Sequence, residues 1–122
     1  MYRQILVRPD QRRFQLIFWR SDHSEPLRSY QLNTVTYGTA SAAYLAVRCL
    51  HQLAIENEQQ FSQASHIIKT DFYVDDLLTG SNSLEELATL CKDISNILSQ
   101  RCFELRKWVS NHPDILTVTG IM

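Results

Sequence analysis

Residues 72–80 read Phe-Tyr-Val-Asp-Asp-Leu-Leu-Thr-Gly, so two adjacent aspartates interrupt an otherwise apolar, β-prone run. Two unit charges about 4 Å apart repel by roughly 4 kcal/mol at an effective dielectric constant of 20. A bound divalent cation would turn this repulsion into attraction, and Mg²⁺ is typically held by one or two carboxylates together with substrate phosphates. The stretch therefore indicates a site for metal-dependent phosphate chemistry.

The composition is that of an ordinary globular chain. Of its 122 residues, 44% are hydrophobic and 20% are charged, and the formal net charge is -1. The chain thus has no overall basic field, which counts against a complete nucleic-acid enzyme. Near the N-terminus, however, Arg3, Arg8, Arg12, Arg13 and Arg20 form a cluster that is either a solvated basic face or a set of phosphate contacts.

The cysteine spacing and the length of the apolar runs indicate in which cellular compartment the protein resides. Cys49, Cys91 and Cys102 are odd in number and have neither zinc-site nor CxxC spacing, which favours free, buried thiols in a reducing environment. No run approaches the roughly 18 apolar residues of a membrane-spanning helix, and the N-terminus lacks the apolar segment of a signal peptide. We expect an intracellular protein of the cytoplasm or nucleus with no membrane partner.

The first half of the chain predicts a hairpin followed by a helix. Residues 14–20 are rich in aromatic and β-branched residues and predict a strand. Residues 30–36 predict a second strand, joined to the first through the polar turn at 21–26. From Ala40 onward, small and apolar residues recur at spacings of three and four, which is typical of a helix face. Residues 55–65 are polar and predict frayed helix and loop.

The acidic pair is predicted to lie on a tight turn. Residues 67–74 predict a third strand, and residues 77–79 predict its antiparallel return. Asp75 and Asp76 would then occupy the turn between the two strands, where side chains are presented rather than buried.

The clearest helix signal follows this turn. Ser83 and Glu86 have the spacing of a capping box just before an apolar run with helical periodicity. Residues 103–108 then alternate like an edge strand, which the turn formers of residues 110–114 should end. The order of elements predicts an α+β fold in which helices pack on one face of an antiparallel sheet.

At this point the residues resemble a known family. Residues 73–76, Tyr-Val-Asp-Asp, match the YxDD box of reverse transcriptases. Residues 1–5, 37–45 and 103–110 extend the likeness. Together these stretches are most similar to the Bel/Pao class of long-terminal-repeat retrotransposons, and the resemblance covers most of residues 1–113.

The resemblance implies an RNA-directed DNA polymerase with a two-metal mechanism. Asp75 matches the metal-binding catalytic aspartate of the box, and Asp76 matches its neighbour, which has a lesser role. In the family, two Mg²⁺ ions, for which Mn²⁺ can substitute, activate the primer 3′-hydroxyl and stabilise the leaving pyrophosphate.

The resemblance also implies residues that bind nucleotide or primer. Tyr73 and Val74 look like the residues that flank the primer end. Gly38 matches the glycine of a motif that contacts the templating pair, and Tyr2 looks like the aromatic gate at the sugar 2′-position. Lys107 is similar to a lysine that acts near the pyrophosphate.

By this resemblance, residues 1–122 are a partial reverse-transcriptase domain, a palm fragment. The resemblance does not include the upstream metal-binding motif, most of the fingers, the thumb or ribonuclease H. The family's other metal ligand is an aspartate of that upstream motif, a few residues before the gate aromatic. Asp10 and Asp22 cannot replace it, because both lie after Tyr2. The implied partners are an RNA or DNA template, a DNA primer, a deoxynucleoside triphosphate and the remainder of the polymerase polyprotein. We expect that this chain alone does not extend a primer.

Other interpretations of the acidic pair stay open. The chain could be an inactive remnant, or Asp75 and Asp76 could form a solvated turn that binds no metal. A phospho-receiver domain also places an acidic pair beside an apolar strand. Such a domain needs a further aspartate and then a lysine, and nothing after Asp114 supplies either.

Overall fold

The computed structural model describes residues 1–120 and contains two compact units, Met1–Ala46 and a second unit that starts at Val47. Helix α1 (Ala42–Glu56) begins in the first unit and ends in the second. Among the described residues, no helix is both long and apolar enough to cross a membrane.

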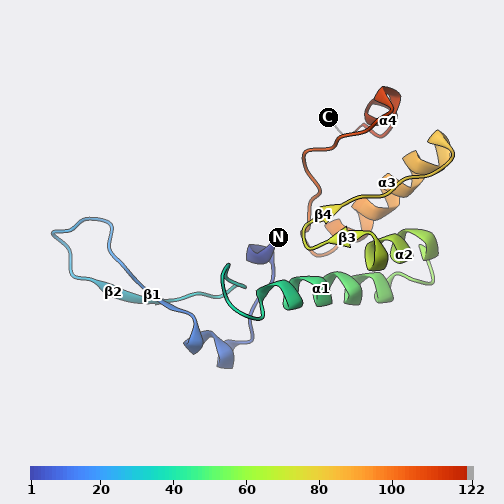
Figure 1. The fold of residues 1–122 in the computed structure, drawn as a ribbon. Helices are drawn as coiled ribbons and strands as arrows, with labels where there is room; N and C mark the ends of the chain where they lie inside the picture. Colours follow the sequence, from blue (N-terminus) through green and yellow to red (C-terminus); the bar gives the residue numbers. More distant parts are fainter. Residues whose placement is uncertain (121–122) are drawn as a thin grey trace. The chain divides into compact units, whose positions relative to one another are not determined.

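The first unit is built on a β-hairpin. Its strands β1 (Leu16–Trp19) and β2 (Arg28–Gln31) run antiparallel (Figure 1). Two short 3₁₀ helices, η1 (Tyr2–Gln4) and η2 (Pro9–Phe14), precede it. Every residue of both strands is exposed, so the hairpin buries little of its own surface. An isolated two-stranded hairpin of this kind is only marginally stable in water.

The second unit is mainly helical. After α1 come α2 (Ser62–Thr70), the short strands β3 (Phe72–Tyr73) and β4 (Asp76–Leu77), then α3 (Leu84–Ser99) and α4 (Pro113–Val118). Helices α2 and α3 lie side by side, and the β3–β4 hairpin directly follows α2 (Figure 1).

Apolar residues of α1, α2 and α3 form the core of this unit, with Leu50 of α1 also buried. Ile68 of α2 and Ile94 and Ile97 of α3 each have 0% of their surface exposed. Burial of a side chain of this size contributes about 1.5–3 kcal/mol relative to its exposure. This packing fixes the position of α2, and therefore the point at which the β3–β4 hairpin starts.

The ends of α1 and α3 are joined by two side-chain amides. Asn57 Nδ2 donates a hydrogen bond to Gln100 Oε1 at 3.0 Å, and Gln100 Nε2 donates to Asn57 Oδ1 at 2.9 Å. Asn57 Nδ2 also donates to the carbonyl of Leu53 at 2.8 Å. The polar groups of buried Asn57 are thereby satisfied, which avoids the cost of an unpaired buried amide.

Helix α3 begins where its sequence predicts. Ser83 is the N-cap, and its Oγ accepts a hydrogen bond from the backbone N–H of Glu86 at 3.4 Å. The Glu86 carboxylate accepts hydrogen bonds from Ser81 and Gln63 instead of from the Ser83 N–H. Half of the predicted capping box therefore forms.

The α+β class and the antiparallel pairing are confirmed. The strand predicted at residues 14–20 is β1, and the helices predicted from Ala40 and after Ser83 are α1 and α3. The second strand, predicted at residues 30–36, lies at Arg28–Gln31. The strands form two separate two-stranded sheets instead of the expected single sheet.

Two predicted strands are wrong, one of them in part. Residues 67–70, half of the strand predicted at 67–74, belong to α2, because Ala64, Ile67 and Ile68 share one helix face that is buried in the core. Of the predicted strand, only Phe72 and Tyr73 are extended, as β3. Residues 103–108 form no strand. The backbone of Lys107 has a left-handed φ of 57°, which an extended strand does not contain.

The cysteines differ in their surroundings. All three thiols are free, with Cys91 buried, Cys49 half-buried and Cys102 exposed just beyond α3. Burial raises the pKa of the Cys49 and Cys91 thiols. The expectation of free thiols thus agrees with the structure, while the expectation that all are buried fails at Cys102.

Ser65 offers a test of this core. Its side chain on α2 is fully buried, and among the described residues its Oγ has no hydrogen-bond partner. We expect Ser65→Ala to raise the free energy of unfolding by about 1 kcal/mol, because it removes an unpaired buried hydroxyl. Urea denaturation followed by circular dichroism measures the change. Ser99→Ala is the matched control, since the exposed Ser99 hydroxyl donates to the Asn96 carbonyl; an equal gain there would contradict the explanation.

Candidate functional site

The β3–β4 hairpin carries the acidic pair on a very short turn. Tyr73 is paired with Asp76, so Val74 and Asp75 alone form the loop. Asp75 therefore lies at the tip, as predicted, whereas Asp76 is the first residue of β4. The predicted return strand begins one residue earlier than expected.

The backbone at the tip is held in an unusual conformation. Val74 has φ 57°, which lies in the left-handed region. This conformation is rare for any residue other than glycine, and for a β-branched residue it is a genuine outlier. Such a conformation costs on the order of 1–3 kcal/mol and clusters at functional sites.

The tip presents its side chains to solvent. Tyr73 is 82% exposed, and Asp75 and Asp76 are also exposed. Within residues 1–120, no salt bridge or side-chain hydrogen bond engages either carboxylate. Both acids therefore keep their full acceptor capacity for a ligand.

The base of the hairpin is closed by Asp71, which the sequence analysis did not single out. Its backbone carbonyl accepts a hydrogen bond from the Leu78 N–H at 3.2 Å. Hydrogen bonds from the side chains of Thr79 and then Thr70 lower the pKa of the Asp71 carboxyl. The sequence signal that could have identified Asp71 is an aspartate just before a strand, with a threonine at each end of the hairpin. Asp71 is a positioning residue, since it braces the hairpin from the end opposite the tip.

Lys107 lies in the irregular segment between α3 and α4 and is exposed. Its left-handed φ of 57° is part of a tight turn in which the Trp108 indole N–H donates to the Leu105 carbonyl at 3.2 Å. The prediction that Lys107 acts near a pyrophosphate is not tested by this arrangement.

Tyr2 and Gly38 belong to the first unit, where the structure brings their segments together. The rings of Tyr2 and Tyr37 pack with centroids 4.6 Å apart and an interplanar angle of 51°. Gly38 follows Tyr37 directly and has φ 85°, a conformation that favours glycine. Two of the residues predicted to bind nucleotide are therefore near neighbours.

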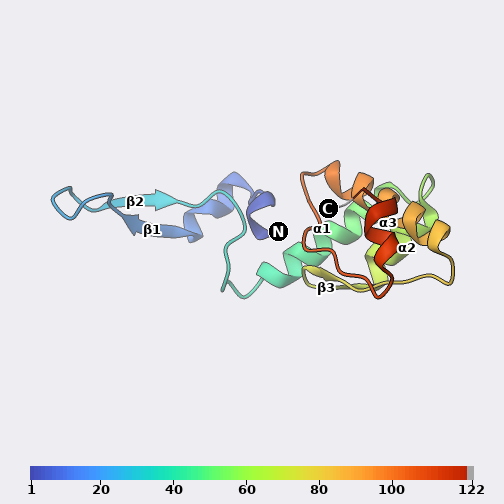
Figure 2. The ribbon, with the colours of Figure 1, turned by 90° about the horizontal axis from the view of Figure 1, so that it is seen from above.

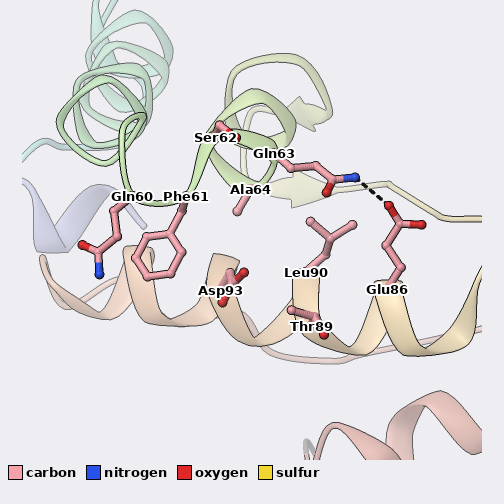
Figure 3. Close-up of a pocket in the computed structure, with 9 residues that line it drawn as sticks. All are labelled: Gln60, Phe61, Ser62, Gln63, Ala64, Glu86, Thr89, Leu90 and Asp93. Atoms are coloured by element: carbon pink, nitrogen blue, oxygen red, sulfur yellow. Dashed lines mark hydrogen bonds between the residues drawn. The ribbon is translucent and has the colours of Figure 1, made fainter.

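A shallow groove lies between the start of α2 and α3, with a volume of about 320 Å³ (Figure 3). Gln63 Nε2 crosses it to donate a hydrogen bond to Glu86 Oε1 at 2.9 Å. Hydrogen bonds from Ser81 and then Gln63 lower the pKa of Glu86. Because the Glu86 carboxylate is already engaged, we interpret the groove as part of the helix–helix contact.

The described part of the chain does not provide a complete set of metal ligands at the hairpin. Within the described residues, no cluster of three or more histidine, cysteine, aspartate or glutamate side chains could hold a metal ion. Asp75 and Asp76 nevertheless supply two adjacent exposed carboxylates, and Mg²⁺ often takes one or two carboxylates plus phosphate oxygens and water.

Comparison of the chain with protein-family models, with curated proteins and with solved structures finds no match. The function is therefore inferred from the hairpin and from the sequence resemblance.

The strain at the tip can be measured. We expect Val74→Gly to raise the free energy of unfolding by about 0.5–1 kcal/mol, because relief of the left-handed strain exceeds the entropic cost of glycine. Val109→Gly is the control, since Val109 is 91% exposed in a loop and has no positive φ. Denaturant unfolding compares the two variants, and a loss of stability in both would show that the turn is unstrained.

The base of the hairpin predicts a pH dependence. Because folding lowers the pKa of Asp71, its stabilising contribution is complete above the ordinary pKa and is lost as the pH falls through the lowered folded-state value. Thr79→Val should raise the pKa of Asp71, and hairpin amide shifts should then change at higher pH in an NMR titration. Thr89→Val, which removes a hydroxyl that donates to the Glu85 carbonyl on α3, should leave the Asp71 titration unchanged. An unaltered Asp71 pKa in Thr79→Val would exclude Thr79 as its cause.

Proposed function

We propose that the β3–β4 hairpin is the metal-binding turn of a reverse-transcriptase palm of the Bel/Pao type, and that the chain contributes this turn to RNA-directed DNA synthesis. In this proposal the chain works with the remainder of the polymerase polyprotein on an RNA or DNA template, a DNA primer and a deoxynucleoside triphosphate. The tetrapeptide of residues 73–76 and the flanking resemblance support this proposal.

One observation carries the proposal. A two-residue loop with a left-handed, β-branched Val74 places Asp75 at the exposed tip of a hairpin. A glycine or asparagine would form this turn at lower cost, so stability alone does not account for the valine. Strain retained beside an unpaired carboxylate is what a site that positions a charged ligand would show.

Each residue of the hairpin has a place in this chemistry. Asp75 is the catalytic metal-binding carboxylate, and Asp76 adds negative charge from the start of β4. Bound Mg²⁺ or Mn²⁺ would activate the primer hydroxyl and neutralise charge on the transferred phosphoryl group. Tyr73, which is largely exposed beside the tip, offers a ring surface for the primer end.

The two alternatives fare differently. A phospho-receiver gathers its acidic residues at the carboxyl ends of parallel strands. The strands in residues 1–120 pair only antiparallel, which gives this alternative no support. An inactive remnant would keep the hairpin but would no longer bind metal there. A measurement of metal binding therefore distinguishes this alternative from the proposal.

Metal binding is measured by titrating the full chain with Mg²⁺ and following backbone amides by NMR. We expect shifts centred on Asp75 and Asp76, and we expect Asp75→Asn to weaken binding at least about tenfold, since even outer-shell changes cost this much. Glu85→Gln is the control, because Glu85 is an exposed acid of the same unit outside the hairpin.

The same variants test catalysis in the polymerase assembled with the remainder of the polyprotein. Primer extension should be lost in Asp75→Asn and reduced in Asp76→Asn. Shifts that spread evenly over exposed acids, or extension that survives Asp75→Asn, would refute the assignment.

A further inference from the structure

The β1–β2 hairpin of the first unit has one face that combines aromatic rings with a cation. In the antiparallel register, Ile17 lies opposite Tyr30 and Trp19 lies opposite Arg28, so all four side chains share one face. Trp19 is 58% exposed and Tyr30 is 45% exposed. We call this set, Ile17, Trp19, Arg28 and Tyr30, the aromatic face.

The aromatic face is hollowed toward the loop that joins the strands. A depression of about 350 Å³ is lined by Trp19, Arg28 and Tyr30, and by Arg20 and Glu25 of the loop. Figure 2 shows β1 running toward this loop and β2 running back from it, side by side and antiparallel. Within residues 1–120, the exposed Arg20 guanidinium donates only a long hydrogen bond of 3.5 Å to the Glu25 carbonyl, and the exposed Arg28 side chain makes no hydrogen bond or salt bridge. Both guanidinium groups are therefore available to a ligand in the depression.

Charge is distributed unevenly between the two units. Residues 1–46 contain six arginines and three acidic residues, a net charge of +3, although the whole chain has -1. The first unit also carries an exposed Phe14 ring with the Arg13 guanidinium 5.0 Å from its centroid. The near-neutral total thus conceals a basic, aromatic-rich unit.

We propose that the aromatic face binds single-stranded nucleic acid. Bases stack on the rings of Trp19 and Tyr30, while the guanidinium groups of Arg20 and Arg28 pair with the phosphates that flank them. Stacked aromatic rings beside cations are the combination by which proteins hold single strands without sequence preference. The positive charge of the unit complements phosphate and favours nucleic acid over an uncharged apolar protein surface.

This site is separate from the proposed metal-binding turn, and the proposal does not rest on that turn. It lies wholly in the first unit, whereas the β3–β4 hairpin lies in the second. It also requires no metal, so binding measured in EDTA and with the Asp75→Asn variant reports on the aromatic face alone.

The experiment uses the full chain and fluorescein-labelled 12-nucleotide oligo(dT) and oligo(U), with binding followed by fluorescence anisotropy in EDTA at low salt. We expect both strands to bind, and we expect Trp19→Ala to weaken binding about tenfold or more. Phe18→Ala is the matched control, because Phe18 is a 73% exposed aromatic of the same strand on the opposite face. Trp19→Phe keeps a ring and should restore most of the affinity.

Salt dependence supplies a second readout that does not require Trp19 to be changed. Each phosphate contact to a single strand contributes about 0.7 to the slope of log affinity against log salt concentration. Arg28→Ala should reduce that slope by about this amount, and Arg106→Ala, in the second unit, should leave it unchanged. Circular dichroism establishes that each variant is folded.

Three outcomes would overturn the proposal. The first is no binding at low salt, and the second is equal loss in Trp19→Ala and Phe18→Ala. The third is a Trp19-dependent self-association in sedimentation velocity without oligonucleotide binding, which would make the aromatic face a protein interface instead.

Discussion

The second unit depends on the apolar contact between α2 and α3. Helices α2 and α3 are in contact, and Ile68 of α2 and Ile94 and Ile97 of α3 are fully buried. This packing favours a helix where the local sequence predicts a strand. Helix α2 ends at Thr70 and β3 begins two residues later, so the helix pair also determines where the hairpin leaves the core. A turn as short as Val74-Asp75 keeps an unfavourable backbone conformation only if the chain on both sides is fixed. On one side that support is α2, and at the base of the hairpin it is the set of hydrogen bonds around Asp71.

Sequence reasoning succeeded where local chemistry determines the structure. Ser83 followed by an apolar run locates the start of α3 to the residue, and the acidic pair at 75–76 locates the turn to within one residue. It failed where tertiary packing overrides local preference. Ile67 and Ile68 are β-branched, yet they are helical because α3 offers them a buried site. The segment 103–108 alternates like a strand but finds no neighbouring strand with which to pair.

The sequence predicted the acidic residues of the candidate site but not the backbone conformation and hydrogen bonds that hold them in place. Asp75 follows from the tetrapeptide, whereas the left-handed φ of Val74 has no local sequence signal, because valine disfavours that conformation. The role of Asp71 depends on Thr79 approaching from across the hairpin, and strand register decides that approach. The aromatic face of β1–β2 likewise emerges only from the pairing of Trp19 with Arg28. The cluster of arginines was visible in the sequence, but its combination with exposed rings on one face was not.

The three thiols have a practical consequence. Cys91 is buried and Cys49 is half-buried, and burial raises the pKa of both thiols, which lowers their reactivity. Cys102 stands in solvent at the end of α3, on a backbone with φ 61°. A maleimide dye or spin label added to the unmodified protein would therefore attach first at this one position. The chain comes with a native attachment point from which movements of the acidic hairpin could be followed without engineering the sequence.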